Sequence, residues 1–163
     1  MMHKILFSVI IVAGCFYGGV SISYALKQRC DNLKELISAV REMQNCIMAA
    51  GMPVYIIYKR LSGTTQVGKM FSYMAESAET DNLRLWEKAL DRISISKEDR
   101  KPLTELASGL GSAGREYQTA QMDICLSGLA KQLEEAEEKY NSEGKLCRKL
   151  GVYAGILIVL FLI

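Results

Sequence analysis

Residues 63–70, GTTQVGKM, come close to the phosphate-binding loop of nucleotide-dependent enzymes, whose pattern is G-x-x-x-x-G-K-[ST]. The last position of that pattern supplies a hydroxyl to Mg²⁺, and here it is Met70, which has no oxygen. The pattern also requires a preceding strand, whereas VYIIYKRLS after Pro53 favours a short helix. We therefore expect a turn between two helices at this place and no nucleotide site.

Other side chains with catalytic or metal-binding chemistry are scarce. His3 is the single histidine, so neither a histidine-based triad nor a histidine metal site can be assembled further along the chain. The densest acidic run, EEAEE at 134–138, lies among polar residues, which leave a carboxyl pKa unsuited to acid–base work. We expect a protein that is not an enzyme and has no cofactor, metal or small-molecule substrate.

The charge balance and the cysteines limit the classes of partner and the cellular compartment that we expect. Every charged residue except Lys4 falls in 27–149, which therefore carries 19 basic and 18 acidic side chains, a net charge of +1. That balance gives no electrostatic footprint for nucleic acid. The cysteines are odd in number and include no C-x-x-C pair, which predicts reduced thiols in a reducing compartment. They are Cys15, Cys30, Cys46, Cys125 and Cys147.

The chain begins with a short tail, 1–4, and then an apolar stretch, 5–26, that has no formal charge. As a helix this stretch would reach about 33 Å, which is enough to cross a bilayer core. Small residues before Ala25 also fit a signal-peptide cleavage site, and the residues up to Cys15 resemble a lipoprotein signal. We expect an uncleaved transmembrane helix; the alternative is a secreted or lipid-anchored helical module processed at Ala25 or Cys15.

A second uncharged stretch, 150–163, is expected to be a C-terminal membrane helix, although it would reach only about 21 Å. Basic residues flank the polar region between the two stretches, so the positive-inside rule places that region in the cytoplasm. The basic side chains expected to contact the membrane surface are Lys27, Arg29, Lys34, Arg148 and Lys149.

Each apolar stretch contains two glycines four residues apart, a spacing that lets membrane helices approach closely. The pairs are Gly14 with Gly18, and Gly151 with Gly155. We expect them to pack the two membrane helices together or to dock partner helices.

The region 27–149 has the apolar periodicity of helices. We expect the first helix to continue from the membrane to about Ala50, and Pro53 to open the second. Asp81 or Thr80 caps the fourth, and Ser96 with an acidic residue three positions later begins the fifth. A heptad seam predicts a long sixth helix, with Met122, Leu126, Leu129, Leu133, Ala136 and Tyr140 along it. The predicted fold class is all-α: a six-helix antiparallel bundle flanked by N- and C-terminal transmembrane helices.

Several segments carry a resemblance to a known family: LWEKAL, then LTELASGLG, then Gln118, a long acidic helix and the tail KLCRKLGVYAGILIVLFLI. Together they resemble the stage III sporulation protein AB family of endospore-forming bacteria. The resemblance implies a six-helix bundle similar to the cytoplasmic domains of the type II secretion platform protein F. It also implies a location in the mother-cell membrane of sporulating cells.

The resemblance implies a function as well. It predicts a non-enzymatic scaffold subunit in a secretion-like channel complex between mother cell and forespore. The implied partners are membrane lipid, the complex's cytoplasmic ATPase, stage III sporulation protein AA, and the other membrane subunits.

Overall fold

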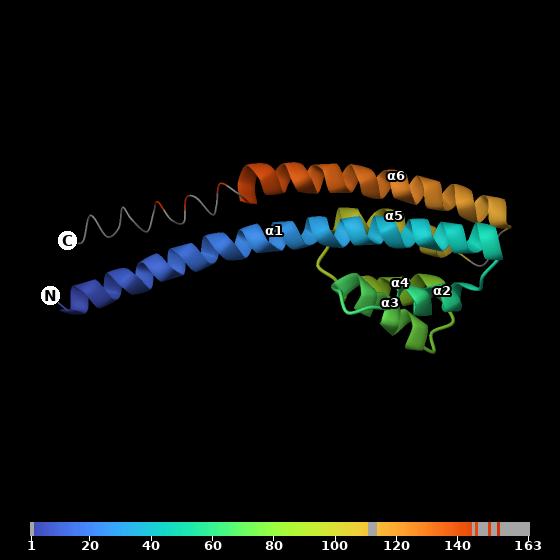
Figure 1. Ribbon diagram of the computed structural model, residues 1–163, viewed down its shortest axis with the longest axis horizontal. Helices are drawn as coiled ribbons and strands as arrows, with labels where there is room; N and C mark the ends of the chain where they lie inside the picture. Colours follow the sequence, from blue (N-terminus) through green and yellow to red (C-terminus); the bar gives the residue numbers. More distant parts are fainter. Residues whose placement is uncertain (1, 111–113, 145, 147–149, 151–152, 154–163) are drawn as a thin grey trace. The chain divides into compact units, whose positions relative to one another are not determined.

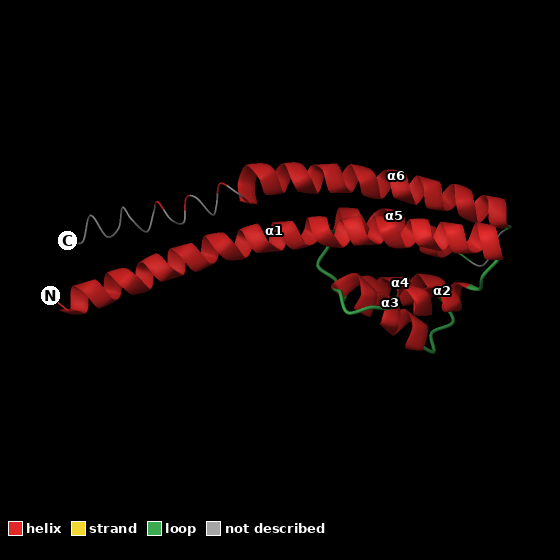
Figure 2. Ribbon diagram, viewed as in Figure 1, coloured by secondary structure: helices red, strands yellow, loops and turns green. Residues whose placement is uncertain are grey.

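The computed structural model describes residues 2–110, 114–144, 146, 150 and 153, and all of their regular secondary structure is helical (Figures 1 and 2). This confirms the all-α class and the six predicted helices for the described part of the chain. The helices are α1 (Met2–Ala50), α2 (Val54–Leu61), α3 (Gln66–Glu76), α4 (Asn82–Leu90), α5 (Lys97–Gly109) and α6 (Arg115–Lys139), followed by a π-helical turn, Tyr140–Gly144.

The break between α1 and α2 forms where the sequence predicts it. Gly51 has φ 56°, in the left-handed region that favours glycine, and its N–H donates to the carbonyl of Ile47 at 3.1 Å. Pro53 then precedes the first helical residue, and its carbonyl accepts from the N–H groups of Ile56 and Ile57. Pro53 is therefore the N-cap residue of α2 and lies just before the first turn, not within it.

The chain divides into two compact units, one of residues 29–134 and one that joins 1–28 to 135–163. The first unit lies inside the predicted domain 27–149 and contains α2 to α5 with parts of α1 and α6. Its interior is mainly apolar, and Asn32 and Asp99 are buried polar side chains within it. The largest fully buried side chains are Trp86, Phe71, Leu33, Leu36, Met43, Ile57, Met70, Leu90, Leu103, Leu106, Met122 and Leu129.

Three aromatic rings from α2, α3 and α4 meet in this interior. The ring centroid of Trp86 lies 6.3 Å from that of Tyr58 and 6.2 Å from that of Phe71, both with edge-on geometry. Trp86 also donates its indole N–H to the Tyr58 hydroxyl at 2.9 Å. The buried indole is thereby satisfied, and each edge-on pair adds about 0.5–1.5 kcal/mol beyond the burial of area.

Helix α5 begins with the predicted capping box. Ser96 accepts from the N–H of Asp99, whose carboxylate accepts from the N–H of Ser96. Pro102 lies inside α5, which begins at Lys97. The ring is accommodated at Gly128 of α6, where an added Cβ would lie 2.9 Å from the proline Cγ.

The apolar pattern of α6 differs in detail from the prediction. On α6 the fully buried residues of the seam are Met122, Leu129 and Ala136, and Cys125 is buried beside them. Leu126 and Leu133 are only half-buried. The seam therefore lies slightly to one side of the ideal heptad line.

The second unit contains the N-terminal part of α1. Gly19 and Ser23, one helical turn apart, are buried there. A Cβ on Gly144, in the π-helical turn, would lie 3.4 Å from Cδ1 of Leu26, so this turn packs closely on α1.

Among the described residues, no helix combines the length and the apolarity needed to cross a membrane. The transmembrane helices predicted at 5–26 and 150–163 are accordingly not found in this part of the chain. The first stretch belongs to α1, a single helix of 49 residues that continues through polar residues to Ala50. Most of the second stretch lies outside the described residues.

Candidate functional site

The predicted membrane-surface residues fall into three groups. Lys27 and Lys34 are exposed on α1. Arg29 is partly buried and forms an ion pair with Asp99. Arg148 and Lys149 lie outside the described residues. The sequence predicted the same role for Lys27, Arg29 and Lys34, but Arg29 differs from the two lysines in burial.

Arg29 and Asp99 form a bidentate ion pair between α1 and the first turn of α5. The guanidinium donates from Nε to Oδ2 at 2.8 Å and from a terminal nitrogen to Oδ1 at 2.7 Å. The Asp99 side chain has no exposed surface, and that of Arg29 is 20 % exposed. Because Asp99 also accepts from the N–H of Ser96 at 2.8 Å, both oxygens are used. We call Arg29, Ser96 and Asp99 the α1/α5 clamp.

The clamp keeps the buried carboxylate ionised. Burial raises the pKa of Asp99, but the hydrogen bonds from Arg29 and from the backbone of Ser96 act against it and prevail. The pKa of Asp99 consequently lies below its ordinary value. A carboxylate held in this way stabilises an interhelical contact, and it is not available as a proton acceptor for a substrate.

A second polar contact ties α1 to α3 and to the segment after α4. The Asn32 side chain is buried and donates to Gln66 Oε1 at 3.0 Å and to the carbonyl of Ser94 at 3.1 Å. Asn32 lies one turn beyond Arg29 on the same helix. The two contacts together fix α1 against three separate parts of the chain, 34 to 70 residues away in sequence.

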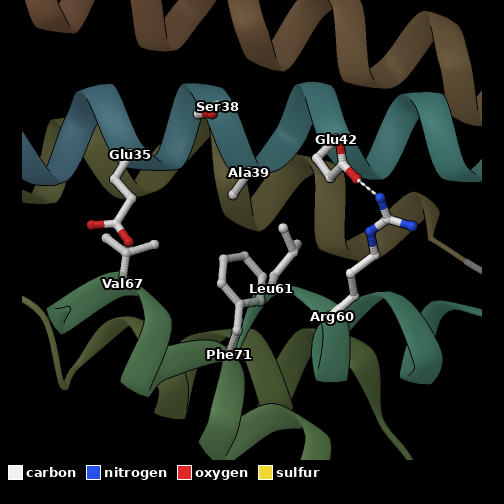
Figure 3. Close-up of a pocket in the computed structure, with 8 residues that line it drawn as sticks. All are labelled: Glu35, Ser38, Ala39, Glu42, Arg60, Leu61, Val67 and Phe71. Atoms are coloured by element: carbon white, nitrogen blue, oxygen red, sulfur yellow. Dashed lines mark ion pairs between the residues drawn. The ribbon is translucent and has the colours of Figure 1, made fainter. Parts of the chain in front are cut away.

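Further along α1, a hollow of about 360 Å³ opens between α1, α2 and α3 (Figure 3). Its apolar part comes from Ala39, Leu61, Val67 and Phe71. Its polar part consists of two carboxylates, a hydroxyl and a guanidinium, contributed by Glu35, Glu42, Ser38 and Arg60. We call it the α1/α3 hollow.

Both carboxylates of the α1/α3 hollow have partners in the chain. Arg60 lies 2.9 Å from Glu42, and the Thr65 hydroxyl donates to Glu35. These contacts attach the end of α2 and the start of α3 to α1. Within the described part of the chain, no group of three or more His, Cys, Asp or Glu side chains is arranged to hold a metal ion. The chemistry of the hollow is that of a packing contact or a shallow recognition surface.

The glycines of GTTQVGKM have a packing role. A Cβ on Gly68 would lie only 2.7 to 2.8 Å from backbone atoms of Gly63, so the turn after α2 touches the first turn of α3. Thr65 caps α3 by accepting from the N–H of Gly68 at 3.0 Å. The segment follows a helix and not a strand, which confirms the predicted turn between two helices.

The predicted glycine pair on α1 lies on an exposed face. No described atom comes within 4 Å of an added Cβ at Gly14 or Gly18. Among the described residues of this part of α1, the small ones that are buried are Gly19 and Ser23, on a different face. Gly151 and Gly155 lie outside the described residues, so the predicted packing role of the four glycines stays a prediction.

The interhelical contacts were the part of the site that the sequence did not reveal. Ser96 with Asp99 was recognised as a capping box, but the same carboxylate also binds Arg29. A signal was available: a carboxylate in a first helical turn and a basic residue on an amphipathic helix can pair. The sequence offers several such pairs and does not say which one is buried.

Comparison with known proteins identifies the family. The profile of the family described as stage III sporulation protein AB matches residues 4–163. The chain belongs to this family. Membership in the stage III sporulation protein AB family supports a role in sporulation.

A curated member of the stage III sporulation protein AB family has similar length. Stage III sporulation protein AB of Bacillus subtilis (strain 168) is 24 % identical over 170 residues, which cover 99 % of this chain and 99 % of the relative. A solved structure of a stage III sporulation protein AB has 22 % sequence identity and a TM-score of 0.58. It matches over 69 % of this chain and 96 % of that chain, so the two share the helical fold.

Proposed function

We propose that this chain is a non-enzymatic scaffold subunit of a secretion-like complex between mother cell and forespore, held at the mother-cell membrane. In this role the helical unit 29–134 faces the cytoplasm and couples a cytoplasmic ATPase, stage III sporulation protein AA, to membrane subunits of the complex. The proposal rests on family membership together with one observation, the continuity of α1.

The continuity of α1 supports a mechanical link. One helix contains the uncharged stretch 5–26, then the clamp residue Arg29, and then Glu42 of the α1/α3 hollow. A load on the small helices α2 to α5 would therefore act on α1 through named bonds: the α1/α5 clamp, the Asn32 contacts and the Arg60–Glu42 pair. The polar side chains that bridge the helices serve this attachment.

Membrane attachment is proposed from the sequence of α1. The 22 residues from 5 to 26 carry no formal charge, and Lys27 follows at once. The exposed side chains of Lys27 and Lys34 can meet anionic headgroups, at about 1 kcal/mol for each basic residue near the surface. Arg29 contributes to the α1/α5 clamp instead.

Deletion and complementation test this function. We expect cells that lack the chain to form far fewer heat-resistant spores, and a copy of the full chain to restore them. A copy without residues 1–26 should fail although it accumulates in the cell. Normal spore numbers in the deletion strain would rule out the scaffold role. Full restoration by the shortened copy would rule out the membrane attachment and leave the role in sporulation standing.

A further inference from the structure

A second hollow lies between the last turns of α1 and the first turns of α6. It has a volume of about 490 Å³ and is lined by Met48, Glu116, Thr119, Ala120 and Asp123. We call it the α1/α6 groove. Met48 is 57 % exposed there, and the lining includes two carboxylates and no basic side chain.

Apolar side chains extend the surface around this groove. Tyr117 and Ile124, next to the two carboxylates on α6, are 52 % and 58 % exposed. Methionine and tyrosine are enriched where proteins meet, because both combine large apolar area with adaptable contacts. A partner that fits must present apolar side chains beside a positive charge.

Helix α2 of the same chain presents such a surface. Tyr55 and Ile56 are exposed, and Lys59 is exposed one turn after Tyr55, so the three share one side of the helix. We call these three residues the α2 ridge. The ridge thus combines two apolar side chains with a cation, and it complements the carboxylates and Met48 of the groove.

The ridge cannot reach the groove of its own copy. The α2 helix is bonded to α1 through Arg60 and Glu42, and α6 is bonded to α1 through Gln44 and Asp123. In Figure 1, α1 passes between α6 and the layer that contains α2, so α2 and α6 lie on opposite sides of α1. A contact between the α2 ridge and the α1/α6 groove therefore requires a second copy of the chain.

We propose that the α2 ridge of one copy docks in the α1/α6 groove of the next. Lys59 then lies between Glu116 and Asp123, while Tyr55 and Ile56 cover Met48. The contact joins different surfaces, so it repeats from copy to copy and builds a row, which closes into a ring if the rotation allows it. The scaffold role proposed above does not require this association.

Carbodiimide coupling of the full chain in phosphatidylglycerol–phosphatidylethanolamine vesicles tests the contact. The reagent joins a lysine amine to a carboxylate with which it is in contact. Copies with light and heavy nitrogen are mixed, so a mixed-isotope peptide proves that a bond joins two copies. We expect mixed-isotope peptides between Lys59 and Glu116 or Asp123, and a ladder of dimers, trimers and larger species on denaturing gels.

Charge-reversal variants test whether association depends on the contact between Lys59 and Glu116. Because the Lys59→Glu variant removes its own amine, association is read by the sedimentation of the full chain in detergent. K59E and E116K should each weaken association by at least about tenfold, since each sets like charges against one another. The double variant K59E/E116K should recover association, because the swapped charges attract again. The matched control E134K changes an exposed α6 residue about 16 Å along the helix from Asp123 and should associate like the wild type.

The contact is exposed, so the variants should keep the fold, which circular dichroism and Trp86 fluorescence verify. Asp123 also accepts from Gln44 and is therefore left unchanged. A wild-type chain that stays monomeric would overturn the proposal. So would a double variant that fails to recover, or cross-links that need neither Lys59 nor the groove carboxylates. The scaffold role is judged separately by complementation.

Discussion

Arg29 and Asp99, 70 residues apart in sequence, are joined by two hydrogen bonds of 2.8 and 2.7 Å, and the carboxylate is fully buried. The same carboxylate accepts from the N–H of Ser96 and so also caps α5. One side chain thus fixes the start of a helix and the position of that helix on α1. Removing one partner of this buried pair should destabilise the fold more than removing one partner of an exposed pair, because the remaining charge stays desolvated.

The first prediction concerns this α1/α5 clamp. Asp99→Asn should lower the free energy of unfolding by about 2–4 kcal/mol, because it leaves the Arg29 charge without its counterion. Urea titration followed by fluorescence of Trp86, the single tryptophan, measures the loss. The control is Asp91→Asn, which breaks the more exposed pair with Arg100 and should cost less than about 1 kcal/mol. Equal effects of the two substitutions would contradict a special role for Asp99.

The clamp also predicts a dependence on acid. The pKa of Asp99 is lower in the folded chain than in the unfolded chain, where it is about 3.9, so unfolding takes up a proton at low pH. The stabilisation should be complete above about pH 5 and should disappear as the pH falls through the lowered folded-state pKa. The difference in unfolding free energy between wild type and D99N should therefore shrink on acidification. A difference that is constant with pH would show that the carboxylate charge is irrelevant.

The aromatic interior predicts the opposite behaviour in alkali. Burial raises the pKa of Tyr58 to about 12, although the hydrogen bond from Trp86 lowers it. The unfolded chain loses this proton near pH 10, so stability should fall from about pH 10 upwards. Tyr58→Phe removes this component of the pH dependence but costs about 1–2 kcal/mol at neutral pH, since the Trp86 N–H loses its acceptor. If the unfolding free energies of the wild type and Tyr58→Phe fell in parallel as the pH rises, the buried Tyr58 hydroxyl would not be the cause of the alkaline loss of stability.

The glycines of GTTQVGKM allow a matched comparison. Gly68→Ala should destabilise the fold by about 1–3 kcal/mol, because the new Cβ would meet the Gly63 backbone at 2.7 Å. Gly63→Ala places its Cβ 3.7 Å from the nearest atom and should be nearly neutral. Thermal unfolding of the two variants distinguishes them. A stabilisation of the wild type by ATP that depends on Lys69 would contradict the packing role of this segment.

Cysteine labelling can show on which side of the membrane the helical unit lies, but it needs an exposed cysteine. Cys125 is buried, and burial raises its pKa to about 12, so it should react with maleimide only through unfolding. We expect an introduced cysteine at the exposed Lys97 to be labelled quickly, and only from the cytoplasmic side. Labelling of Lys97→Cys from outside intact cells would favour the secreted or lipid-anchored alternative. In that case the intact mass of the protein would show processing at Ala25 or Cys15.

Local signals let the sequence predict where the helices begin and end. Gly51 and Pro53 mark a break, Asp81 caps α4 through the N–H of Leu83, and Ser96 begins α5. Each of these decisions is made within a few residues, so the printed sequence contains the information. The resemblance identified the family through motifs in the second half of the chain, and the match of residues 4–163 confirms it.

Contacts between distant helices were not predictable in the same way. The partner of Asp99 depends on which helix faces meet, and several basic residues were suitable by type. Leu83 of α4 is apolar by type but 37 % exposed, whereas Leu85 and Ala89 of the same helix are buried. Gly68 was recognised as part of a turn, whereas its close approach to Gly63 depends on the path of the backbone.

The most direct test of the scaffold role is purification of the full, affinity-tagged chain from membranes of sporulating cells, followed by identification of the proteins that accompany it. We expect the cytoplasmic ATPase and membrane subunits of the sporulation complex to be enriched over an untagged control. The D99N variant, extracted in equal amount, should retain less of the ATPase because its helical unit is weakened. A wild-type chain that purifies without any subunit of the complex would contradict the proposed role.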